Sequence, residues 1–115
     1  MVARRQDIKV EAGANFQLVI DVSETGTAQP LIGASARMEV RQYRDASSPV
    51  LLSADSTSGT IVLNTVASQV QIDVPYTDLE SVTWDTAWYD VELTRAGKRW
   101  RLIEGRALAS PQTTQ

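Results

Sequence analysis

The residues best suited to recognition chemistry lie in one stretch near the C-terminus. Residues 86–111, TAWYDVELTRAGKRWRLIEGRALASP, contain two of the three tryptophans and four arginines. Tryptophan beside arginine is typical of nucleic-acid and carbohydrate sites, because the indole ring stacks and the guanidinium donates hydrogen bonds. Arginine stems also simply cover apolar surface in ordinary hairpins. The stretch is therefore either a binding site or a hairpin that closes a small fold.

Acidic residues in the same stretch are the first candidates for proton chemistry. Asp85, Asp90 and Glu92 lie close in sequence, and a carboxylate pair at the right separation can hydrolyse glycosidic bonds. Asp90 and Glu92 share one strand face, where they would face arginines across the hairpin. Nothing nearby in the sequence indicates a cleft or a raised pKa. We therefore expect solvent-facing carboxylates. The loop DSTSG at 55–59 has too few acidic residues for a calcium site, and we expect a polar turn.

Composition argues against most enzyme classes. The chain has no histidine and no cysteine, which removes Ser–His nucleophile pairs, disulfides and cysteine-based metal sites. We expect no catalytic residue, no cofactor and no metal. The net charge of -3 is mild and the arginines are dispersed, so we expect no nucleic-acid partner. No apolar run resembles a signal peptide or a membrane span, and we expect no membrane association.

The elements that must position these residues are strands. A length of 115 residues suits one domain, which we place at 1–110, followed by a polar tail at 111–115. Apolar and polar residues alternate, and turn residues recur about every ten positions, as in an antiparallel sandwich. The sequence predicts an all-β antiparallel β-sandwich or barrel of about seven to eight strands, at 7–11, 15–22, 34–43, 49–53, 60–64, 69–74, 86–94 and 98–108.

One segment breaks the alternation. PYTDLESVTW, residues 75–84, begins with a proline and then places Thr77 three residues before Glu80, which is the spacing of a capping box. The pattern predicts one short helical turn near 77–82 that crosses from one sheet to the other. Leu79 and Val82 would pack beneath it.

Strand period sorts the residues of the last hairpin. Tyr89, Val91 and Leu93 share the core face of one strand, so Trp88 should lie on the outer face or at a sheet edge. Trp100 and Leu102 should face the core, while Arg99 and Arg101 oppose the outer acids. Gly105 suggests a bulge at Glu104–Gly105 that would re-aim the residues after it. The residues expected to contact a partner are Arg4, Arg5, Trp88, Arg99, Arg101 and Arg106.

The order of three stretches resembles that of a known family. They are RRQDIKVEAGANFQLVIDV, LIGASARMEVR and YDVELTRAGKRWRLIEGRALASPQTT, which together run from Arg4 to about Pro111. They resemble small virion proteins of tailed bacteriophages, whose fold is similar to the immunoglobulin-like N-terminal domain of baseplate upper proteins. Most of the shared motifs are structural, so they bear on fold more than on role.

The resemblance implies a non-enzymatic structural protein of the virion, assembled in the host bacterial cytoplasm. It implies protein–protein contacts with other virion proteins, in multiple copies within a symmetric oligomer, as a tail, baseplate or fibre-attachment adaptor. One alternative is a capsid decoration (cement) or collar protein of the same fold. A second is a carbohydrate-binding module that uses Trp84 and Trp88.

Overall fold

The computed structural model describes residues 4–22, 31–45, 47–80 and 82–110. The predicted tail at 111–115 lies outside these residues. Nine strands are found within them: β1 (Arg4–Arg5), β2 (Ile8–Glu11), β3 (Phe16–Asp21), β4 (Ser35–Arg41), β5 (Val50–Asp55), β6 (Ile61–Asn64), β7 (Gln69–Val74), β8 (Thr86–Arg95) and β9 (Lys98–Ser110).

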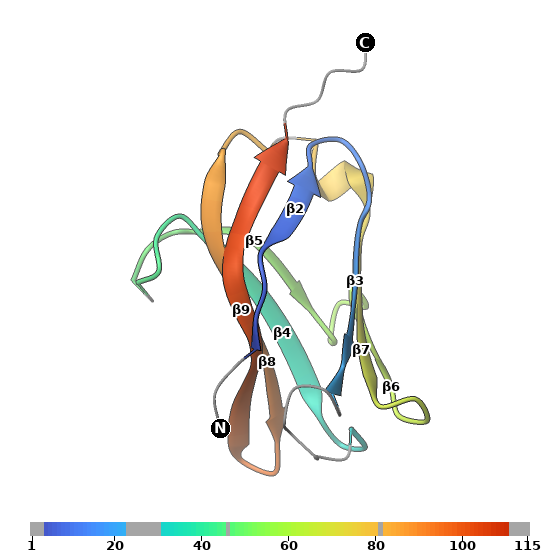
Figure 1. Ribbon diagram of the computed structural model, residues 1–115. Coiled ribbons are helices and arrows are strands. Elements are labelled where there is room, and N and C mark those ends of the chain that lie inside the picture. The colour runs from blue at the N-terminus through green and yellow to red at the C-terminus, as the bar shows by residue number, and fades with distance from the viewer. Residues whose placement is uncertain (1–3, 23–30, 46, 81, 111–115) are drawn as a thin grey trace.

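The strands form two facing sheets, as Figure 1 shows. The larger sheet has the order β1-β9-β8-β4-β5, and β2 also pairs with β9. The smaller sheet has the order β3-β7-β6. The prediction of an all-β sandwich is confirmed.

The core lies between the sheets and follows the predicted alternation. Val40, Val91 and Leu93 of the larger sheet are fully buried, and Val70 of the smaller sheet is too. Successive side chains of a strand point to opposite faces, so one half of each strand supplies apolar surface to the core. The other half of β4, β8 and β9 forms an outer face that is rich in charged residues.

The helical segment is shorter than predicted and differently capped. A 3-10 helix (η2) spans Tyr76–Asp78, its N-cap is Pro75, and no side chain caps it. The capping box of Thr77 and Glu80 was therefore wrong, because the helix begins one residue before Thr77 and ends before Glu80 is reached. Leu79 is fully buried and Val82 packs partly against the core, as predicted.

The prediction of a wholly antiparallel arrangement was wrong at the N-terminus. β1 and β2 both pair parallel with β9, with Arg5 opposite Glu104 and Ile8 opposite Ala107. Strand alternation reports which face is buried but carries no information on the direction of the neighbouring strand. The strand expected at 7–11 is β2, and β1 is an additional short strand before it.

The bulge in β9 lies at Leu102, two to three residues before the predicted position. Val91 of β8 pairs with Ile103, whereas the next residue, Glu92, pairs with Arg101. Leu102 is therefore the extra residue, and both Leu102 and Ile103 are buried. The bulge inverts the alternation and places Glu104 and Arg106 on the outer face. Trp100 pairs with Leu93 on the inner face, as predicted, but is only half-buried.

Gly105 has a different role from a bulge residue: the N-terminal segment crosses it closely. A Cβ at this position would clash with the carbonyl group of Gln6. The Gln6 N–H donates to the Glu104 carbonyl at 2.9 Å, and the Tyr89 hydroxyl donates to the Gln6 carbonyl at 2.5 Å. The backbone N–H of Arg106 donates to the Asp7 carboxylate at 3.0 Å. The missing side chain thus lets the segment between β1 and β2 lie against β9.

Gly105→Ala should destabilise the protein by about 3 kcal/mol, because the new methyl group overlaps backbone that cannot yield as a flexible side chain would. Urea unfolding measures this free energy. Gly59→Ala is the control, since a Cβ there meets open space and only its φ of +91° is unfavourable, at a cost of about 1 kcal/mol. Equal losses for the two variants would contradict the close crossing at Gly105.

Tyr89→Phe should lower the free energy of unfolding by about 1 kcal/mol, because it removes one hydrogen bond to the Gln6 carbonyl and leaves the ring in place. The measurement is again urea unfolding. Tyr43→Phe is the matched control, since Tyr43 is an exposed tyrosine. If the two substitutions have the same effect, the Tyr89 hydroxyl does not anchor the N-terminal segment.

Candidate functional site

The outer face of the larger sheet carries a tryptophan surrounded by guanidinium groups. Trp88 of β8 lies opposite Arg41 of β4 and Arg106 of β9. The Cζ atoms of Arg44, Arg106 and Arg5 lie 5.4, 5.5 and 5.9 Å from the centroid of the Trp88 ring. Each distance is within the range of a cation–π interaction. We call Trp88 with Arg5, Arg44 and Arg106 the arginine cage.

Three separate parts of the chain build the arginine cage. Arg106 reaches the outer face because of the bulge at Leu102. Arg5 lies in β1 opposite Glu104, and is therefore brought in by the crossing at Gly105. Arg44 follows β4 in the connection to β5, where Ser48 Oγ donates to the Tyr43 carbonyl at 2.9 Å. No short sequence motif contains the cage, because the fold assembles it.

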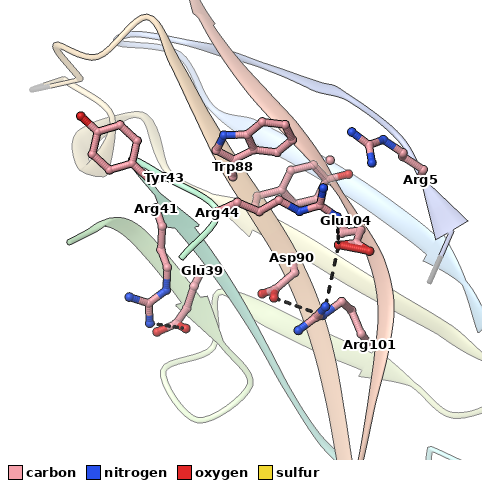
Figure 2. A pocket seen from close by; sticks show the side chains of 11 residues that line it. Arg5, Glu39, Arg41, Tyr43, Arg44, Trp88, Asp90, Arg101 and Glu104 are labelled. Carbon is pink, nitrogen blue, oxygen red and sulfur yellow. Dashed lines mark hydrogen bonds and ion pairs between the residues drawn. The ribbon is translucent and has the colours of Figure 1, made fainter. Parts of the chain in front are cut away.

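A row of carboxylates lies next to the cage. Glu39, Asp90 and Glu104 face one another across β4, β8 and β9. Figure 2 shows how arginines contact this row. Arg41 pairs with Glu39 at 3.0 Å, and Arg44 pairs with Glu104 at 3.2 Å. Arg101 lies 3.4 Å from Asp90 and 3.8 Å from Glu104, and Arg37 lies 3.9 Å from Glu39. The positive charges offset the repulsion between the neighbouring carboxylates, and the contacts restrain the arginine side chains.

Trp88, Arg5 and Arg44 of the cage, together with the carboxylate row, border a small hollow of about 90 Å³. Burial raises the pKa of Asp90, and the neighbouring Glu92 carboxylate raises it further, whereas Arg101 lowers it. The expectation that nothing near these acids supplies a cleft or a raised pKa was therefore wrong. Trp88 and two residues of the connection after β4, Tyr43 and Arg44, line the hollow. The alternation of residues along a strand does not predict where such a connection lies.

The structure brings together four of the six residues expected to contact a partner: Arg5, Trp88, Arg101 and Arg106. The other two lie elsewhere. Arg99 pairs with Thr94 and lines a second hollow with Asp55 and Glu92. Arg4 lies opposite Ile103, one residue out of phase with Arg5.

The sequence did not predict that β4 and the connection after it supply residues to the arginine cage and the carboxylate row. Alternation in SARMEVR, residues 35–41, puts Glu39 and Arg41 on the face opposite Met38 and Val40, but the sequence does not show that this strand neighbours β8. Arg44 lies in a loop, where strand period gives no signal. The signal that the sequence offers for Arg44 is its place directly after the strand predicted at 34–43.

The two tryptophans of the carbohydrate hypothesis are unsuited to stacking on a sugar. The ring of Trp88 is already surrounded by the three guanidinium groups of the cage. Trp84 packs partly against the core. A sugar would have to displace charged groups from one ring and apolar neighbours from the other, and both displacements oppose binding.

Two comparisons with known proteins found no match. No protein-family model matches the sequence, and no curated protein is significantly similar to it. Within the described residues, no group of three or more acidic side chains is arranged to hold a metal ion. No helix in that part of the chain is long and apolar enough to cross a membrane.

Asp90→Asn should stabilise the protein at neutral pH. Because folding raises the pKa of Asp90, the folded protein binds this proton more tightly than the unfolded chain does. The carboxyl group therefore favours folding below its unfolded pKa, and this contribution is lost as the pH rises through the folded-state pKa. The gain from the neutral amide should therefore be largest near pH 7 and vanish below the ordinary aspartate value of about 4. Urea unfolding across this pH range measures it.

Asp45→Asn is a control of opposite sign. The backbone N–H of Ser47 donates to the Asp45 carboxylate at 2.9 Å and lowers its pKa. This stabilisation is present above the unfolded pKa and disappears as the pH falls through the folded one. Asp45→Asn should thus destabilise at neutral pH. A neutral-pH loss in both variants would contradict a desolvated Asp90.

Proposed function

We propose that this chain is a non-enzymatic structural protein of a tailed-phage virion, acting as an adaptor in the tail, baseplate or fibre-attachment apparatus. The resemblance of the three stretches between Arg4 and Pro111 supports this identity. The absence of histidine and cysteine from the sequence agrees with a role in contacts more than in chemistry. On this proposal, the protein works in several copies and contacts other virion proteins.

The single observation that carries the adaptor role is the arginine cage. Tryptophan and arginine are the residue types that most often dominate the binding energy of protein interfaces. Here three arginines from distant parts of the chain lie around one tryptophan on the outer face of the larger sheet. Ordering long side chains costs conformational entropy, and a site that has already ordered them loses less on binding. The face is therefore suited to holding a protein partner.

The experiment is to locate the protein in purified phage particles by immunogold electron microscopy and cryo-electron microscopy. We expect it in multiple symmetry-related copies at the tail, with mass spectrometry of the particles detecting the chain. Density on the shell or at the neck would identify the capsid decoration or collar alternative and contradict the adaptor role. Absence from the particles would overturn the virion assignment as a whole.

A further inference from the structure

We propose that the arginine cage is a binding site for an acidic peptide segment of a protein partner. The guanidinium groups of Arg5 and Arg106 would donate hydrogen bonds to the carboxylates of this segment. The inference deepens the proposed function, because it names the chemistry of the partner that the adaptor face would hold. It rests on charge balance, on the fixed positions of the guanidinium groups and on the neighbouring carboxylate row.

The charge balance around Trp88 is the reverse of that of the whole chain. Five arginines gather there, Arg5, Arg41, Arg44, Arg101 and Arg106, against four acids, which are the three of the row and Asp7 beside Arg106. The difference is 5 − 4, or +1, on a protein whose net charge is -3. The excess therefore lies on one small part of one sheet face.

Two particular arginines carry this excess. Arg41, Arg44 and Arg101 each contact a carboxylate of the row. Arg5 and Arg106 form no ion pair with any residue that the structure describes, and both are exposed. Their guanidinium groups lie near one ring, at 5.9 and 5.5 Å from the Trp88 centroid. Two ordered guanidinium groups with free donors are the arrangement that binds carboxylates with paired, charge-assisted hydrogen bonds.

The carboxylate row selects a peptide over a nucleic acid. A phosphate backbone carries closely spaced negative charges, and where it crossed the row it would bring phosphates onto Glu39, Asp90 and Glu104. A peptide can place a carboxylate at Arg5 and Arg106 while presenting backbone N–H groups or a basic side chain to the row. The hollow of about 90 Å³ also suits one small group. The face thus complements a chain of isolated acidic residues.

The test uses the full chain and a peptide with blocked ends in which single glutamates are separated by glycine and serine, titrated at low ionic strength and followed by isothermal calorimetry. The peptide should bind, and Arg5→Gln with Arg106→Gln should weaken binding at least about tenfold, because each charge-assisted hydrogen bond contributes strongly to affinity. The matched control is Lys98→Gln with Arg99→Gln. It also removes two positive charges from exposed positions, but at the other end of β9. This control should leave the affinity unchanged within about twofold.

A second readout covers the case in which the double variant does not fold. In the wild-type protein, NMR of the arginine Nε–H groups during the titration should show the largest shifts at Arg5 and Arg106. Absence of binding, or equal loss in the two double variants, would overturn the proposal. So would tighter binding of a DNA duplex of equal charge through the same arginines. The assay needs no virion, so a protein that binds the peptide but is absent from particles would contradict the proposed function and leave this inference standing.

Discussion

The position of Gln6 against β9 is the constraint on which the outer face depends. Its carbonyl accepts the Tyr89 hydroxyl and its N–H donates to the Glu104 carbonyl, while the neighbouring Asp7 accepts the Arg106 N–H. Only a residue without a side chain leaves room for this crossing, and Gly105 supplies it. Since β1 immediately precedes Gln6, the same contacts fix where Arg5 lies.

The bulge at Leu102 is the second condition for the arginine cage. Without an extra residue in β9, strict alternation would turn Arg106 toward the core together with Leu102. The bulge buries Leu102 and Ile103 in succession and turns Glu104 and Arg106 outward. One local irregularity thus supplies both a member of the cage and a member of the carboxylate row. The core side loses nothing, because the extra residue is apolar and fully buried.

Much of the fold could be predicted from the sequence because it depends on the alternation of apolar and polar residues along each strand. The alternation of Tyr89, Val91 and Leu93 placed these residues in the core and Trp88 outside, and the structure agrees. The parallel pairing of the N-terminal strands could not be predicted, because alternation is the same for either direction. The helix start at Tyr76 was missed because Pro75 replaced a polar side chain as the N-cap.

The candidate site was predictable only in part, for a related reason. Residues on β8 and β9 belong to one hairpin, so their proximity follows from the sequence. The contributions of Arg44 and Glu39 depend on β4 pairing with β8, which is a long-range contact without a local signature. The raised pKa of Asp90 has the same origin, since burial and charges from neighbouring strands cause it.

The crossing at Gly105 brings Arg5 to the ring of Trp88, beside Arg106. Nuclear Overhauser effects between the Trp88 indole protons and the side chains of Arg5 and Arg106 in solution test it most directly. We predict contacts from both arginines in the wild-type protein, and loss of the Arg5 contacts in a folded Gly105→Ala variant. A folded wild-type protein without contacts between Arg5 and the indole ring would contradict the account.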